Sequence, residues 1–134
     1  MYMAIPGQAI PSAWRRYGAA ETNQLDNSRA KWLIDLFLKY PQARFDILHA
    51  SFPYTAETAE IAKIFPNVYL NAAWTDTLSP IAYKNLFKEW LTYVPLNKLF
   101  AFGSDQFNVL SVAANAERVR DLIATALTEL IEEG

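Results

Sequence analysis

Apolar residues recur every three or four positions in four segments of the chain, which is the spacing of one face of a helix. The four segments are 30–38, 59–64, 86–91 and 112–131. Thr55 is expected to cap the second helix. Ser79 followed by Pro80 predicts the start of the third, because serine is a good cap and proline suits the first helical position. The pattern therefore predicts four helices after residue 27.

Short apolar runs separate these predicted helices. They are 44–49, 68–73 and 98–102, lengths that favour strands over helices. Strands that alternate with helices pair in parallel through right-handed crossovers. Because these strands are apolar along their length, both faces of the sheet are expected to be covered. The sequence predicts an α/β fold with three parallel strands.

The first 27 residues lack this periodicity. Pro6, Gly7, Pro11 and Gly18 interrupt them, which predicts an irregular segment with a weak strand at Tyr2–Ile5. That strand would raise the number of βα units from three to four. The 134 residues suit a single domain, so one domain over 1–134 is expected, with its βα units at 28–134.

Composition narrows the classes of function. Hydrophobic residues make up 52% of the chain and the net charge is −2, without a basic cluster. Neither nucleic acid nor a membrane is therefore an expected partner. Cysteine is absent, which excludes disulfides and thiolate metal sites. The first residues lack the features of a signal peptide, so a cytoplasmic location is expected. The high apolar content predicts that a partner covers part of the surface.

Polar side chains follow the predicted strands at their carboxyl ends, where parallel α/β folds place their chemistry. His49 closes the first strand and is the only histidine in the chain, and Asp105 follows the last strand. Either side chain could bind a metal or transfer a proton. A histidine hydrogen-bonded at the edge of the core and an aspartate in a turn are the structural alternatives. Asn71, Trp74 and Asp76 follow the middle strand and are candidate pocket residues.

Several segments, taken in order, resemble the metal-dependent amidohydrolase family. Phe45–Tyr54 resembles a strand and loop that reads roughly F-x-L-x-H-x-x-Y-P-Y in that family, and Phe65–Asn71 resembles its F-P-N-V-Y-L-D/N strand. Trp74, Leu78-Ser79-Pro80, Glu89-Trp90-Leu91 and Val94–Lys98 follow in the same order. Phe100–Asp105 resembles the F-G-S/G-D end of the final barrel strand. The resemblance covers residues 28–134.

This resemblance implies the C-terminal half of a TIM barrel, a (β/α)8 fold with its active site at the carboxyl ends of the strands. His49 would match the histidine of the sixth barrel strand and Asp105 the aspartate of the eighth. In the family these residues help to hold one or two divalent metals, here zinc or manganese, and act on the attacking water. Substrates in the family are small amides, esters, lactones and carboxylates.

The chain departs from the family in two respects. A complete barrel needs about 250 residues, and the remaining histidine ligands of the family have no counterpart here because His49 stands alone. An open partial barrel would also expose apolar strand residues to water. A homo-oligomer, or pairing with a chain that supplies the missing strands, is therefore expected. Two further readings stay open: a non-catalytic binding or assembly module derived from a barrel, and an unrelated small α/β ligand-binding domain.

Overall fold

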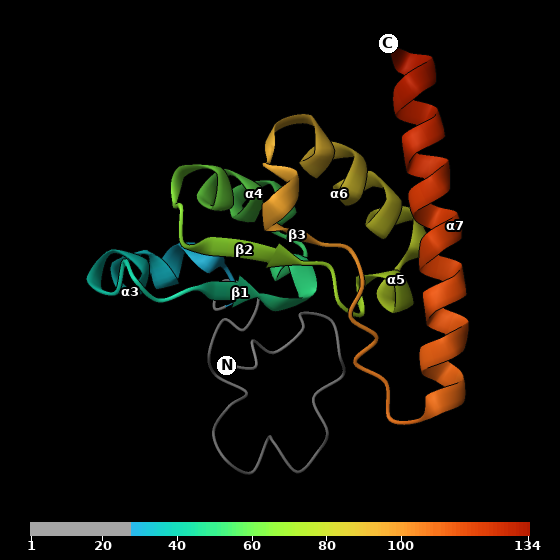
Figure 1. The fold of residues 1–134 in the computed structure, drawn as a ribbon, viewed down its shortest axis with the longest axis horizontal. Coiled ribbons are helices and arrows are strands. Elements are labelled where there is room, and N and C mark those ends of the chain that lie inside the picture. Colours follow the sequence, from blue (N-terminus) through green and yellow to red (C-terminus); the bar gives the residue numbers. More distant parts are fainter. Residues whose placement is uncertain (1–27) are drawn as a thin grey trace.

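The computed structural model of the chain describes residues 28–134 (Figure 1). The predicted irregular segment 1–27 and its strand at Tyr2–Ile5 lie outside the described residues. Strands β1 (Phe45–Ile47), β2 (Val68–Asn71) and β3 (Leu99–Phe100) form a parallel sheet in the order β1-β2-β3. The predicted α/β class and the parallel pairing of the three strands are thereby confirmed.

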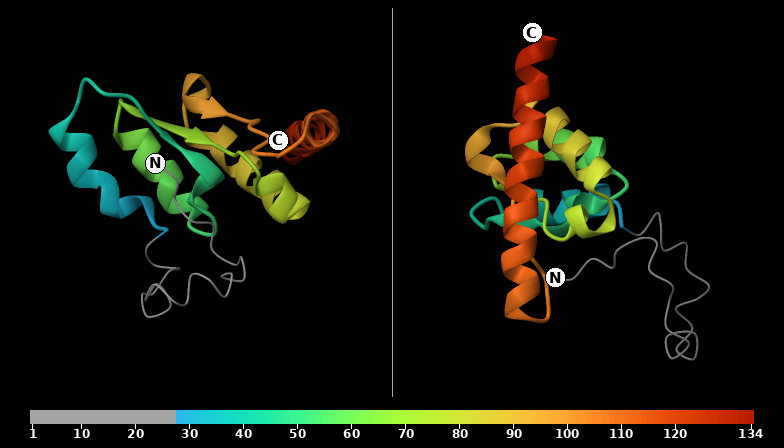
Figure 2. Two further views of the ribbon diagram at one scale, coloured as in Figure 1. Left: turned by 90° about the horizontal axis from the view of Figure 1, so that it is seen from below. Right: turned by 90° about the vertical axis from the view of Figure 1, so that its right-hand side faces the viewer.

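Helices make up most of the described chain. They are α3 (Ile34–Lys39), α4 (Thr55–Ile64), α5 (Thr75–Leu78), α6 (Pro80–Tyr93) and α7 (Val109–Glu133), with short 3-10 turns η2 (Ala30–Leu33), η3 (Leu48–Ser51) and η4 (Leu96–Lys98). Helices α3, α4 and α6 lie on one side of the sheet, and α7 stands beside α6 (Figure 2). The connections β1-α4-β2 and β2-α6-β3 have the predicted strand-helix-strand order.

The ends of several elements differ from the prediction. Each strand is two or three residues shorter than the apolar run that predicted it. Thr55 is the first residue of α4 and not its cap, which is Tyr54. The Ser79 prediction is confirmed, since the Ser79 hydroxyl accepts a hydrogen bond from the Ala82 amide at 3.2 Å. The short helix α5 was not predicted.

The two faces of the sheet have different surroundings. Ile47 and Leu70 are register partners and are buried beneath the helices. On the other face Asp46 is exposed, and Phe100 is 47% exposed beside the ring of Tyr69, with ring centroids 6.2 Å apart. The expectation that both faces are covered is therefore wrong for residues 28–134, because their helices pack against one face.

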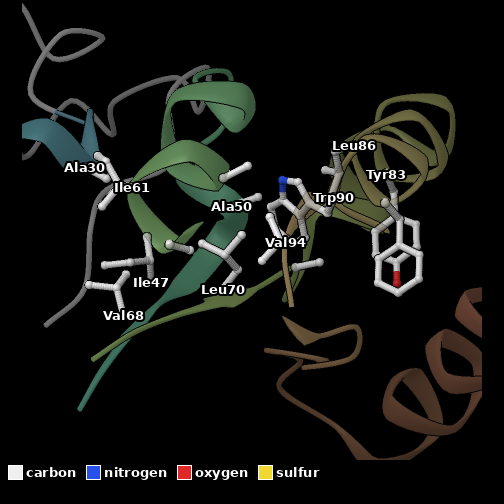
Figure 3. Packing of buried hydrophobic residues seen from close by; sticks show 14 of the residues in the cluster. Ala30, Ile47, Ala50, Ile61, Val68, Leu70, Tyr83, Leu86, Trp90 and Val94 are labelled. Atoms are coloured by element: carbon white, nitrogen blue, oxygen red, sulfur yellow. The ribbon is translucent and has the colours of Figure 1, made fainter. Parts of the chain in front are cut away.

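The hydrophobic core lies between the sheet and helices α4 and α6 (Figure 3). Trp90 is its largest member and is completely buried, with its indole N–H 3.4 Å from the Thr55 carbonyl oxygen. Leu70 of β2 and Leu86 of α6 are also buried in this cluster. The buried aromatic residues of α6 thus pack that helix against the sheet.

Charged side chains join α7 to α6 near the end of the chain. Lys84 pairs with Glu129, and the Lys88 ammonium lies 3.0 Å from Glu129 Oε2 and 2.6 Å from Glu133 Oε1. Hydrogen bonds from Lys84 and Lys88 lower the pKa of Glu129. The carboxylate form of Glu129 is therefore favoured in the folded chain.

Acid should weaken this attachment of α7. Since the pKa of Glu129 is lower in the folded than in the unfolded chain, its contribution to stability is complete above its usual value of 4.5 and is lost as the pH falls through the lowered value. Thermal unfolding between pH 3 and pH 7 measures this effect. Glu129→Gln should unfold at a lower temperature than the unsubstituted chain at pH 7 and at nearly the same temperature at pH 3. An equal difference at both pH values would contradict the expectation.

Candidate functional site

His49 lies just beyond the end of β1, in the turn η3. Its backbone is left-handed (φ 61°), as are those of Ala50 and Ser51, a conformation uncommon for residues with a side chain. The imidazole is buried, and its Nδ1 lies 3.1 Å from the carbonyl oxygen of Ala73. Because a carbonyl only accepts hydrogen bonds, Nδ1 carries the proton and the neutral ring has its lone pair on Nε2.

Asp105 faces this free nitrogen from the loop after β3. Its Oδ2 lies 3.7 Å from His49 Nε2, and its side chain is 41% exposed. Asp105 also has a left-handed backbone (φ 45°). The structure thus brings the two predicted site residues together, one buried and one open to solvent, at the carboxyl edge of the parallel sheet.

Asn71 and Gly103 hold the backbone that positions His49. The side-chain oxygen of Asn71 accepts a hydrogen bond from the Ala73 amide at 3.0 Å, and its amide group donates to Asp46 Oδ2 at 2.9 Å. The carbonyl of Gly103 accepts a hydrogen bond from the Trp74 amide at 3.0 Å. Hydrogen bonds from the Ala73 amide and from the neighbouring Trp74 amide therefore fix the backbone at Ala73. The Ala73 carbonyl in turn orients the imidazole.

Glycine is needed at position 103 because the segments that follow β2 and β3 approach each other closely there. A Cβ atom built on Gly103 would lie 2.8 Å from the Ala73 Cβ and 3.2 Å from the Asn71 side-chain oxygen. Gly103→Ala should therefore displace the support of His49 and destabilise the fold by about 2 kcal/mol. Urea unfolding measures the loss, and the chemical shifts of the His49 ring report the displacement. Ser104→Ala serves as the control, and equal stability of the two variants would contradict the packing argument.

The other two predicted pocket residues have different surroundings. Trp74 lies next to the pair, with its ring edge-on to His49 at a centroid distance of 6.4 Å, and it has a left-handed backbone (φ 59°). Asp76 is buried, and its Oδ2 lies 2.6 Å from Arg118 Nη2. Trp74 can therefore shield the imidazole, whereas Asp76 joins α5 to α7.

Sequence reasoning missed the partners of Asp76. Arg118 also donates hydrogen bonds to Thr77 Oγ1 at 3.2 Å and to Asn115 Oδ1 at 2.9 Å. Burial, and to a lesser degree the charge of Asp76, raises the pKa of Tyr83 far above its usual range. Tyr83 therefore stays protonated and donates a hydrogen bond to the Ala101 carbonyl at 2.6 Å. The sequence does contain one signal for these partners. Asn115 and Arg118 are polar residues three positions apart, which places them on the same side of α7.

The pair offers two donor atoms to a divalent metal. Tetrahedral zinc binds nitrogen and oxygen ligands at about 2.0–2.2 Å, so adjacent ligand atoms lie roughly 3.3–3.5 Å apart. A separation of 3.7 Å between His49 Nε2 and Asp105 Oδ2 therefore suits two neighbouring corners after a small movement. Among residues 28–134, no group of three or more histidine, aspartate or glutamate side chains is placed to hold a metal. These residues fit part of a metal site and do not complete one.

The fold and this site define an α/β chain with a histidine–aspartate pair at the carboxyl edge of a parallel sheet. The chain is similar to protein fluG of Emericella nidulans, with 28% identity over 118 residues. The match covers 87% of this chain and 14% of fluG, so the chain spans about a seventh of the length of this curated relative. No family model matches the chain, and no solved structure matches it. None of the helices over residues 28–134 has the length and apolar character needed to cross a membrane.

Proposed function

We propose that the chain is the C-terminal portion of an amidohydrolase-like, metal-dependent hydrolase that acts on a small amide, ester, lactone or carboxylate. The observation that carries the proposal is the convergence of His49 Nε2 and Asp105 Oδ2 at the carboxyl edge of the sheet. Parallel α/β folds place catalytic groups at this edge. The resemblance of residues 45–105 to the family supplies the class of reaction.

The two side chains have the properties that hydrolysis requires. The hydrogen bond to Ala73 leaves His49 Nε2 able to accept a proton, and the exposed carboxylate of Asp105 can receive one from a water molecule bound beside the pair. A divalent metal, when bound, would supply a water molecule of lowered pKa. Because His49 is the only histidine among these 134 residues, any second histidine ligand would come from outside them.

A second function is supported by the uncovered face of the sheet. Phe100 and Phe102 are 47% and 41% exposed, and Phe107 after them is fully exposed. Exposed aromatic side chains on β3 and in the loop that follows it are typical of a surface that binds another protein. The alternative is a non-catalytic module that assembles through this face, either with itself or with a chain that carries further strands.

Hydrolysis assays on the full chain distinguish the two functions. The chain is incubated with zinc or manganese and with a panel of small esters, lactones and amides. The enzyme proposal predicts turnover, and His49→Gln should lower kcat/KM at least about 100-fold while Asp121→Asn, an exposed change on α7, leaves it unchanged. An inert chain, or equal activity of both variants, would overturn the enzyme proposal. Light scattering would then test the assembly module. An oligomer that forms without metal and that dissociates in the Phe102→Asp variant would support it.

A further inference from the structure

Helix α7 carries a row of exposed side chains along its length. The row advances by alternating steps of three and four residues, which is the spacing of a coiled-coil seam. All seven side chains are exposed: Leu110, Ala113, Glu117, Arg120, Ala124, Leu127 and Ile131. We call this row the outer seam of α7.

The outer seam lies on a different side of α7 from the residues that pack against α6. Val119 and Ala126 are the buried apolar residues of the helix, which contacts α6 along its inner side. At 3.6 residues per turn, the outer seam is centred roughly 140° around the helix from them. In the right-hand view of Figure 2, α7 lies in front of the other helices. Among residues 28–134, the outer seam is therefore a helix face without a partner.

The outer seam has apolar ends and a charged centre. Leu110 near one end is 83% exposed, and Ile131 at the other is 80% exposed. Glu117 and Arg120 occupy the centre. Within the part of the chain that the structure describes, neither of these two charged side chains forms an ion pair. Both charges are thus available to a partner, and so is the apolar surface on either side of them.

The outer seam is complementary to itself when a second copy of α7 runs in the opposite direction. In antiparallel coiled coils the two kinds of seam position alternate across the interface. The register that pairs them sets Leu110 of one copy opposite Leu127 of the other. Ala113 then faces Ala124, so that large residues meet large ones and small residues meet small ones. By two-fold symmetry the same contacts recur at the other end of the pair.

The charges favour this antiparallel register over a parallel one. In the same register Glu117 of each copy lies opposite Arg120 of the other, which forms two reciprocal ion pairs. In a parallel pair Glu117 would face Glu117 and Arg120 would face Arg120, and like charges opposed in this way repel. Charged residues at the centre of an apolar seam therefore specify both the partner and its direction.

We propose that the outer seam of α7 binds a second copy of the chain as an antiparallel, two-fold symmetric helix pair. Residues 110–131 span about 33 Å of helix at 1.5 Å per residue. A helix contact of this length buries on the order of 1,000 Å² in total, which is near the lower bound of a specific interface. The fully exposed Phe107, which precedes α7, would extend the contact toward Ile131 of the other copy.

This contact differs from the strand pairing expected for a partial barrel, because α7 provides it and the edges of the sheet stay free. It also uses neither His49 nor Asp105. The proposed dimer therefore stands or falls independently of the proposed hydrolase activity.

Sedimentation equilibrium of the full chain tests the proposed dimer. The unsubstituted chain should reach twice the monomer mass of 15.2 kDa as its concentration rises through the micromolar range. Leu127→Glu should raise the dissociation constant at least about 100-fold, because it sets a carboxylate against Leu110 of the other copy. Leu38→Glu changes a residue of α3 that is 63% exposed. It is the matched control and should leave the dissociation constant unchanged, and circular dichroism checks that both variants keep their helices.

A charge exchange tests the register of the two helices. Glu117→Arg and Arg120→Glu should each weaken the dimer about tenfold, because each sets like charges opposite one another at two places. The variant with both substitutions reverses every pair and should recover the affinity of the unsubstituted chain. An equimolar mixture of the two single variants should also dimerise, which a folding defect in either variant would not allow.

Four results would overturn the proposal. A monomer throughout the micromolar range would assign the outer seam to a partner other than a second copy. A dimer that Leu127→Glu leaves intact and Phe102→Asp disperses would place the contact on the open face of the sheet. Single charge variants that bind as tightly as the unsubstituted chain would contradict the pairing of Glu117 with Arg120. A double variant that stays as weak as the single ones would contradict the antiparallel register.

Discussion

Trp90→Ala is expected to lower the free energy of unfolding by about 4 kcal/mol, within the range for truncating a buried aromatic residue. The indole is completely buried between the sheet and α4 and contributes a hydrogen bond to Thr55 (Figure 3). Its removal leaves a cavity that the surrounding helices can fill only in part. Since small domains have a total stability of about 5–15 kcal/mol, urea unfolding should show a large shift in the midpoint.

The same helix offers a matched control for this substitution. Ile81 is also apolar, but its side chain is 73% exposed, so Ile81→Ala should change the stability by less than about 0.5 kcal/mol. A loss of similar size in both variants would show that Trp90 does not have the buried position described. Far-ultraviolet circular dichroism checks that both variants keep their helices.

Arg118→Met should destabilise the fold by about 2 kcal/mol. The substitution keeps much of the aliphatic length and removes the cation from Asp76, whose side chain is 2% exposed. Breaking a fully buried ion pair costs roughly 3–5 kcal/mol. The smaller value is expected because the Arg118 side chain is 43% exposed, so water can reach the carboxylate once the guanidinium is gone.

A double-mutant cycle separates the ion pair from simple loss of packing. In the Asp76→Asn background the buried group is neutral, so Arg118→Met should then cost less than half as much. Thr77 and Asn115 lose the same hydrogen bonds from Arg118 in both backgrounds, and their contribution cancels in the cycle. Additive losses would contradict a direct interaction between Asp76 and Arg118.

The parallel order of the strands and the pairing of His49 with Asp105 were predictable from local patterns. Both residues follow apolar runs, and consecutive parallel strands end at one edge of a sheet. The closeness of His49 and Asp105 therefore follows from the strand order, and side-chain geometry is not needed to predict it. The start of α6 was predictable for a similar reason, since Ser79 and Pro80 act within one helical turn.

The left-handed backbone at His49, Ala50 and Ser51 was not predictable from the sequence. Neither alanine nor serine favours positive φ, so the surrounding contacts impose this conformation. One such contact is the hydrogen bond from the Ser51 hydroxyl to the Ser28 carbonyl, which joins residues distant in sequence. The ion pair between Asp76 and Arg118 also joins residues distant in sequence, 42 positions apart, so the spacing of Asn115 and Arg118 on α7 does not identify Asp76 as their partner.

The neighbouring strands of the sheet are also consecutive in the chain. Each strand can therefore pair with its predecessor once the intervening helix has formed, because that helix shortens the free chain whose ends must come together. A chain emerging from the ribosome could add β2 to β1 and then β3 to β2 without waiting for later segments. Helix α7, which packs on α6, would dock after the sheet is complete.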